Sequence, residues 1–189
     1  EPYSEIVPQD AVVLVAGCDC QDDRVEVEIV AFGVGEECWG IEYKTIYGAI
    51  TNPATWTSLD EFLNRSWKHE SGVQLRVASA MIDTGYQSKI VYDFCKPREV
   101  NRVFAIKGVA GVNRPVVSRP NRGNSAKVAL FSLGVDSAKE LIYSRLKIED
   151  SGAGYCHFPI GQGYDEEYFE QLTAEKAVTR VRNGVKSRV

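Results

Sequence analysis

Two strand-sized, mainly apolar segments that each lead to an aspartate constrain this chain most. Residues 12–17 are continuously apolar and are followed closely by Asp19, and the strand expected at residues 73–82 is followed directly by Asp83. A continuous apolar run of this length is typical of a strand that is buried on both faces. We therefore expect two strands inside a sheet, each with a carboxylate at its C-terminal tip.

The patterns between and around these runs predict the order of the other elements. Residues 25–30 and 39–43 alternate between apolar and polar side chains, and short turns precede each, so the first three strands should form an antiparallel meander. Helical spacing begins at residue 55 and returns at 88–95. Further strands are expected at 102–106, 128–133 and 155–158, further helices at 137–146 and from about residue 173, and a long loop at 108–125.

This order predicts one α/β domain over residues 1–189, with a mixed sheet of three antiparallel strands followed by parallel strands and flanked by helices. A helix that connects parallel strands returns to the same sheet, so the strand ending at Asp83 should lie parallel to the strand ending at Asp19. Ligand sites in such sheets form beyond the carboxyl ends of the parallel strands. We therefore expect the two aspartates to meet at one edge.

Two neighbouring carboxylates repel each other unless a cation neutralises them. Mg²⁺ and Mn²⁺ prefer oxygen ligands, and two such ions roughly 3.5–4 Å apart can promote phosphodiester hydrolysis. The chain has only two histidines, His69 and His157, and no C-x-x-C pair, so oxygen ligands are the expected kind. Asp19 and Asp83 are thus the predicted catalytic and metal-binding residues, although a strand-terminal aspartate is often only a turn former.

The composition narrows the class of protein. With 189 residues, 44% of them hydrophobic and 25% charged, the chain has the balance of one globular domain. It has no run long enough to span a membrane and no signal-peptide pattern. Five cysteines, an odd number, favour a reducing cytosol. A start without Met and a basic final stretch suggest a piece of a longer polypeptide.

Positive charge is concentrated in one segment, although the net charge is −4. Between residues 98 and 127 the chain has seven cations and one acid, and four further cations follow residue 179. Such a run is often only a solvated loop, but it also suits DNA phosphates. The residues expected near phosphates are Lys107, Arg114, Arg119 and Arg122.

Short segments in a fixed order run through nearly the whole chain. They are Ala16-Gly17-Cys18-Asp19-Cys20-Gln21 with Arg24, Trp39-Gly40-Ile41-Glu42, Ile82-Asp83-Thr84-Gly85, Ile106-Lys107-Gly108, Ala138-Lys139-Glu140-Leu141-Ile142-Tyr143, His157-Phe158-Pro159 and Leu172-Thr173-Ala174-Glu175. Each segment is short and nonspecific by itself, but the occurrence of all of them in this order is specific. The chain resembles the C-terminal nuclease half of the large subunit of lambda-type tailed-phage terminases.

The resemblance implies a ribonuclease H-like fold and a metal-dependent endonuclease that cuts concatemeric double-stranded DNA during packaging. Asp19 and Asp83 match the first two acids of the family's metal site. The family's third acid lies in an Arg-Asn-Glu-like motif expected beyond Val189, because Arg182-Asn183-Gly184 does not supply it, so this fragment is expected to bind metal weakly and to cut poorly. Glu42 and Glu166 are candidate additional acids, and each also has a simpler interpretation as a surface or capping residue.

The family's ATPase motor precedes the nuclease, and this chain has no G-x-x-x-x-G-K-[ST] phosphate loop. The resemblance also implies the terminase small subunit and the portal of an empty capsid as partners, no membrane partner, and the host-cell cytoplasm as the place of action.

Other interpretations stay open at this point. The Asp83-Thr84-Gly85 turn is typical of aspartic proteases, which need two such turns, whereas this chain has one. An actin-like kinase fragment would need glycines after Asp19 that are absent. Another ribonuclease H-like nuclease of the integrase or resolvase type, and a non-catalytic DNA or protein interaction module, are the remaining alternatives. Metal-dependent DNA cleavage that is lost with either aspartate would separate these classes.

Overall fold

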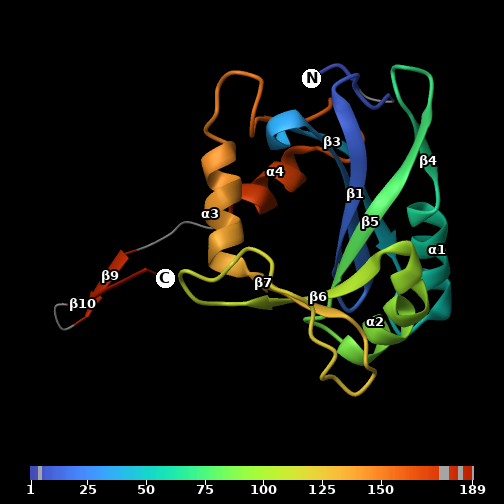
Figure 1. The fold of residues 1–189 in the computed structure, drawn as a ribbon, viewed down its shortest axis with the longest axis vertical. Helices are drawn as coiled ribbons and strands as arrows, with labels where there is room; N and C mark the ends of the chain where they lie inside the picture. Colours follow the sequence, from blue (N-terminus) through green and yellow to red (C-terminus); the bar gives the residue numbers. More distant parts are fainter. Residues whose placement is uncertain (4–5, 175–178, 183–184, 189) are drawn as a thin grey trace.

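A mixed sheet with helices on both of its faces forms the body of the protein (Figure 1). The computed structural model describes residues 1–3, 6–174, 179–182 and 185–188. Eight strands form the main sheet in the order β7-β6-β5-β1-β2-β3-β8, with β4 paired to β5, and β9 and β10 form a separate hairpin. No helix in these ranges is long and apolar enough to cross a membrane.

The elements have the following bounds. The strands are β1 (Ala11–Cys20), β2 (Arg24–Gly33), β3 (Cys38–Tyr47), β4 (Ser66–Lys68), β5 (Gln74–Asp83), β6 (Val103–Val109), β7 (Leu130–Gly134), β8 (Cys156–His157), β9 (Thr179–Arg182) and β10 (Val185–Arg188). The helices are α1 (Pro53–Leu63), α2 (Ser88–Cys95), α3 (Val135–Arg145) and α4 (Glu166–Thr173), with short 3-10 helices η1 (Val34–Glu36) and η2 (Lys96–Asn101).

The strand directions confirm the predicted fold class. Strands β1, β2 and β3 form the antiparallel meander, and β5, β6 and β7 continue the sheet on the other side of β1 as parallel strands. The alternation in β2 explains the meander, because Val25, Val27 and Ile29 are completely buried on one face while Glu26 and Glu28 project from the other.

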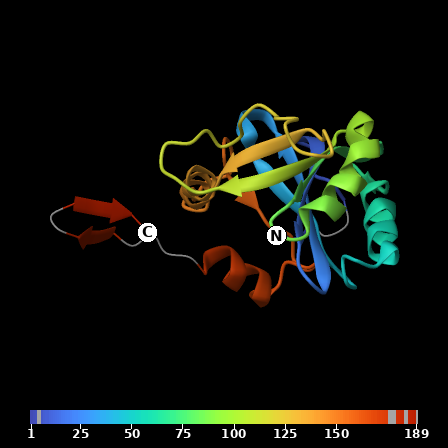
Figure 2. The same cartoon turned by 90° about the horizontal axis from the view of Figure 1, so that it is seen from below.

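The two faces of the sheet are covered unequally (Figure 2). Helices α1 and α2 pack on one face, called here the α1 face, and enclose the main hydrophobic core, which includes Leu14, Leu59 and Ile82. Helices α3 and α4 lie over the opposite α3 face, and neither contains a fully buried residue. The α3 face is therefore the more open side of the sheet.

This asymmetry corrects the expectation that β1 is buried on both faces. Its burial alternates along the strand, and Val12 is 66% exposed. The apolar run is continuous, but only the residues that point toward α1 and α2 are enclosed, since α3 and α4 leave much of the other face uncovered.

Two helices begin at positions that differ from those predicted. Helix α1 begins after Asn52, whose side chain accepts a hydrogen bond from the backbone N–H of Ala54 at 3.0 Å. Helix α4 begins after Asp165, which caps the backbone N–H of Tyr168 in the same way. Helix α4 ends at Thr173, and the helix predicted from about residue 173 falls on residues 175–178, which lie outside the described residues.

Candidate functional site

Asp19 and Asp83 lie side by side at the ends of neighbouring parallel strands. Strands β1 and β5 pair Gly17 with Met81 and Cys18 with Ile82, so the next residue on each strand is an aspartate. Cys18 and Ile82 are buried in the core of the α1 face. Because successive side chains alternate, both aspartates project toward the α3 face. The structure thus brings together the two acids that the sequence singled out.

Local hydrogen bonds orient both carboxylates. The Gln21 amide donates to Asp19 Oδ2 at 3.1 Å, and the backbone N–H of Gly85 donates to Asp83 Oδ2 at 2.9 Å. The Thr84 hydroxyl donates to the carbonyl of Ile106 on β6 at 2.8 Å, which fixes the turn after Asp83. The Oδ1 atom of each aspartate has no hydrogen-bond partner among the residues that the structure describes. One oxygen of each carboxylate is therefore available to a ligand.

Gly85 leaves the room that Asp83 requires. A Cβ atom at Gly85 would lie 2.7 Å from Asp83 Oδ2, closer than nonbonded atoms approach. The Asp-Thr-Gly turn therefore has a steric reason for its glycine. Any larger residue would have to displace the Asp83 carboxylate.

The thiol of Cys20 responds to both aspartates. Burial, followed by the negative charges of Asp19 and Asp83, raises its pKa to about 12. The thiol therefore stays protonated at neutral pH and does not offer a thiolate ligand. The groups at this edge that could hold a cation are carboxylate oxygens, a type of ligand that suits Mg²⁺ or Mn²⁺.

Glu26 is an acid near this site that the sequence analysis did not select. It pairs with Asp19 across β1 and β2 and projects from the same face. Its carboxylate accepts a hydrogen bond from Arg24 Nε at 2.8 Å. The alternating pattern of β2 and the tight turn before it contained the register signal that could have identified Glu26. Within the described part of the chain, no three His, Cys, Asp or Glu side chains converge as a metal-binding cluster.

The other two acids proposed from the sequence are placed differently. Glu42 accepts hydrogen bonds from Arg65 at 3.0 Å and from Trp67 Nε1 at 3.0 Å. It pairs with Ile29, a core residue of the α1 face, so Glu42 projects from the face opposite the aspartates. Glu166 is exposed in the first turn of α4. Neither residue is brought into a cluster with Asp19 and Asp83.

A groove begins beside Glu26 and runs between β3 and α4. It has a volume of about 410 Å³. Its lining residues are Arg24, Glu26, Tyr43, Thr45, Tyr47, Gly163, Asp165, Glu167, Tyr168 and Gln171. Three tyrosines and three acids thus border the open side of the sheet next to the aspartate pair.

Glu28 fastens α4 to the sheet at one end of this region. Its carboxylate accepts hydrogen bonds from the hydroxyls of Tyr164 at 3.0 Å and Tyr168 at 2.9 Å. Burial raises the pKa of Glu28, while the two tyrosine hydroxyls act in the opposite direction by stabilising the charged form. The carboxylate therefore holds the helix over the α3 face.

The four predicted phosphate contacts are in different environments. Lys107 is exposed on β6, one position beyond Ile106, the residue that pairs with Asp83. Exposed Arg114 donates to the carbonyl of Ala110 at 2.9 Å and lies beside the end of β7. Exposed Arg119 makes no ion pair with any residue that the structure describes. The side chains of residues 175–189, including the basic tail and Arg182-Asn183-Gly184, lie outside the described residues.

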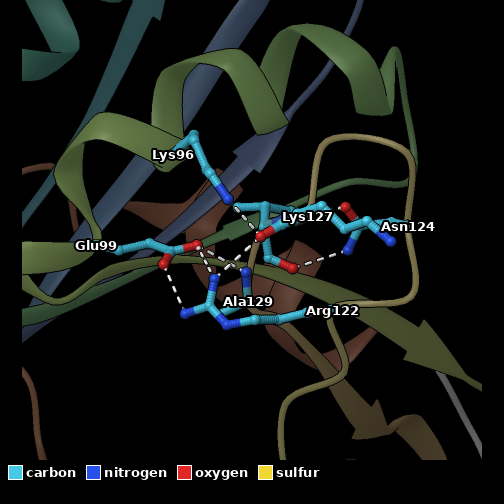
Figure 3. A network of polar contacts seen from close by, with 7 residues as sticks. Lys96, Glu99, Arg122, Asn124, Lys127 and Ala129 are labelled. Carbon is cyan, nitrogen blue, oxygen red and sulfur yellow. Dashed lines mark hydrogen bonds and ion pairs between the residues drawn. The ribbon is translucent and has the colours of Figure 1, made fainter.

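Arg122 already has a partner within the protein (Figure 3). Its guanidinium forms two hydrogen bonds to the Glu99 carboxylate, at 3.2 and 2.7 Å, and a third to the carbonyl of Lys127 at 3.0 Å. Glu99 also accepts the backbone N–H of Ala129 at 2.7 Å, and Lys96 donates to the Lys127 carbonyl. The Arg122 guanidinium holds the pKa of Glu99 below its usual value. Arg122 thus ties its segment to η2.

The mixed sheet with carboxylates at two adjacent parallel strand tips defines the class as a ribonuclease H-like α/β domain. The sequence matches the family described as "Terminase large subunit gpA, endonuclease domain" over residues 1–189, and the chain belongs to this family.

Two curated relatives agree with this family. The chain is 35% identical over 192 aligned positions to the terminase large subunit of Escherichia phage lambda, covering 98% of this chain and 30% of that protein. It is 31% identical over 182 positions to the terminase large subunit of Enterobacteria phage P21, covering 93% of this chain and 28% of that protein. The chain thus spans less than a third of the length of these relatives. No solved structure matches it.

Proposed function

We propose that this domain is a divalent-metal-dependent endodeoxyribonuclease that cuts concatemeric phage DNA during genome packaging. The observation that carries the proposal is the register of β1 and β5, which aligns Asp19 with Asp83 on the open face of the sheet. Membership of a terminase endonuclease family supports the same activity.

Asp19 and Asp83 are the residues that would hold the metal, with the free Oδ1 atoms as its first ligands. Mg²⁺ or Mn²⁺, as a pair of ions in the proposed reaction, would supply activation of the attacking water and stabilisation of the leaving 3′-oxygen. Gln21 and the Gly85 backbone keep the two carboxylates oriented. A pair of ions requires more oxygen ligands than these two carboxylates offer, and Glu26, which pairs with Asp19, is a further acid on the same face.

Double-stranded DNA is the proposed substrate, approached at the edge of the sheet where the parallel strands end, because the aspartates and Lys107 both lie at this edge but project from opposite faces. Lys107, Arg114 and Arg119 are exposed cations that would neutralise phosphates without reading sequence. Arg122 is a weaker candidate, because a phosphate would have to compete with Glu99 for it. In the intact terminase the proposed partners are the small subunit and the portal of the procapsid, in the host-cell cytoplasm.

Two alternative classes fit the structure less well. The single Asp-Thr-Gly turn follows a parallel strand between helices, whereas an aspartic protease needs two such turns. Integrase- and resolvase-type nucleases would share the aspartate geometry, but the match to a terminase family over the whole chain favours packaging.

Plasmid cleavage with Mn²⁺ tests the proposal. Wild-type protein should nick and linearise supercoiled DNA, and Asp19→Asn or Asp83→Asn should lower the rate by at least about 100-fold, because a lost metal ligand should cost more than the roughly 10–100-fold typical of a residue that only supports a ligand. Asp93→Asn is the matched control, since Asp93 is a surface acid on α2 that pairs with Lys89. Cleavage that persists in both Asp19→Asn and Asp83→Asn would refute the assignment of these aspartates as metal ligands.

A further inference from the structure

Two cysteines far apart in the sequence face each other across neighbouring strands. Cys38 begins β3 and Cys156 begins β8, and the two residues are direct partners in the parallel pairing of these strands. The next pair, Trp39 and His157, stacks its rings with a centroid separation of 5.0 Å. The register at this position is therefore held by side-chain packing on both strands as well as by the backbone.

The two thiols interact with each other and with positive charge. A hydrogen bond from the Cys38 thiol is the main cause that lowers the pKa of Cys156 to about 7, burial opposes this change, and the charges of Arg145 and His157 lower it further. The same hydrogen bond is the main cause that raises the pKa of Cys38. Cys156, whose thiol also donates to the carbonyl of Gly154 at 3.9 Å, is thus the more readily ionised thiol of the pair.

This pair is accessible, unlike the other three cysteines. Cys38 and Cys156 are half-buried and line an apolar groove of about 200 Å³ between the sheet, α3 and α4. Cys18, Cys20 and Cys95 are at most 5% exposed in the core of the α1 face. A small thiol reagent in solvent would therefore meet only the first pair.

We propose that Cys38 and Cys156 are a redox-active dithiol that closes reversibly to a disulfide by exchange with a low-molecular-weight disulfide. Directly paired residues on adjacent strands have Cα atoms roughly 5 Å apart, within the range of about 4.4–6.8 Å that a disulfide spans. Closure at this position therefore needs no rearrangement of the sheet.

The exchange proceeds in two balanced steps. The Cys156 thiolate attacks one sulfur of the external disulfide, forms a mixed disulfide and releases one thiolate. Cys38 then loses its proton and attacks the Cys156 sulfur, which forms the internal bond and releases the second thiolate. The external disulfide is reduced to two thiols, and the protein loses two hydrogen atoms.

Closure would tie the edge strand β8 to the meander. The segment between β8 and α4 contains Tyr164, which holds Glu28 together with Tyr168 of α4. A covalent link would also restrict the unfolded chain, because it joins residues far apart in sequence. The oxidised protein should therefore unfold at a higher urea concentration than the reduced protein.

Oxidised glutathione, followed by alkylation and peptide mass mapping, tests the proposal. Wild-type protein should lose two hydrogen masses and give one linked peptide pair containing Cys38 and Cys156, reversed by dithiothreitol. Cys38→Ser should instead trap one glutathionyl group on Cys156, and Cys156→Ser should react much more slowly. Cys95 in the wild-type protein is the internal control and should be alkylated only after denaturation.

Two outcomes would overturn the proposal. One is recovery of both thiols in free form after incubation with oxidised glutathione, while a small exposed control dithiol is oxidised under the same conditions. The other is a link that joins two molecules or uses a core cysteine. Neither result depends on the DNA-cleavage assignment, so this test and the nuclease test fail separately.

Discussion

At the scale of single residues, backbone register explains why the two aspartates meet. Their apolar neighbours Cys18 and Ile82 are fixed in the core, so the polar residue that follows each must project from the other face. The backbone amide of Gly85 and the side chain of Gln21 then orient the carboxylates. The candidate site is thus positioned by packing of residues that do no chemistry.

Gly85→Ala should weaken metal binding at this edge while the fold is kept. The added methyl would lie within 2.7 Å of Asp83 Oδ2 and displace the carboxylate. We expect Mn²⁺ affinity, measured by calorimetry or electron paramagnetic resonance, to fall about 10-fold or more. Gly17→Ala is the control, because a methyl group there has open space around it. Equal affinity in both variants would contradict the proposed role of Gly85.

Two substitutions of Glu28 should separate the contribution of its charge to protein stability from the contribution of its hydrogen bonds. Glu28→Leu leaves the hydroxyls of Tyr164 and Tyr168 without their acceptor, and the loss of this acceptor should lower the free energy of unfolding by about 1–3 kcal/mol. Glu28→Gln keeps an acceptor oxygen and removes the ionisable group. Urea unfolding at neutral pH should therefore rank the glutamine variant above the leucine variant.

The pH dependence of the wild type follows from the raised pKa of Glu28. The folded protein binds this proton more tightly than the unfolded chain, whose carboxyl pKa is near 4.5, so the stability contribution is lost as the pH rises above that value through the folded pKa. The stability of the wild type relative to Glu28→Gln should thus be greater at about pH 4.5 than at pH 7.5. A difference that does not change with pH would contradict this account.

At the scale of elements, local sequence patterns correctly predicted those strands and helices that form through local interactions. The meander followed from alternation and short turns, and helix α2 from its apolar spacing and the proline after it. The start of α4 was missed because the cap residue Asp165 is followed by two further acids and not by an apolar residue. The apolar run of β1 also could not show which face of this strand is left exposed, since that depends on how helices distant in the sequence pack on the sheet.

The basic segment before β7, residues 98–127, shows that the sequence also could not reveal which cations are free to bind DNA. Its charge was evident in the sequence, but the Glu99 partner of Arg122 belongs to another element and became visible only in the structure. Backbone hydrogen bonds from Ser118 to Ser132 and between Asn121 and Leu130 hold part of this segment along the edge of β7. Arg119 therefore lies on an ordered edge of the sheet.

Salt-dependent DNA binding should distinguish these cations. Each phosphate contact that is lost should lower the slope of log K against log salt concentration by about 0.9. Lys107→Ala and Arg119→Ala should each show this change in fluorescence-anisotropy titrations of a DNA duplex without divalent metal, so that the DNA is bound but not cut. Arg122→Ala should change the slope less, because its guanidinium is engaged with Glu99. Unchanged slopes for Lys107→Ala and Arg119→Ala would remove both residues from the interface.

At the scale of the whole molecule, the sheet separates stability from the proposed chemistry. The α1 face contains the main core, and the α3 face presents the aspartates, Glu26 and the groove beside α4. The sequence predicted the fold class and the aspartate pair because both follow from strand order. It did not predict Glu26, whose position depends on the register between β1 and β2, or the opposite orientation of Glu42.

Anomalous X-ray scattering from crystals soaked in Mn²⁺ tests the central claim most directly. We predict a manganese peak within roughly 2–2.3 Å of oxygen atoms from both Asp19 and Asp83, absent in crystals of Asp19→Asn. Manganese bound elsewhere on the protein, with no peak between these two carboxylates at saturating concentration, would contradict the claim that the paired strand tips form a metal site.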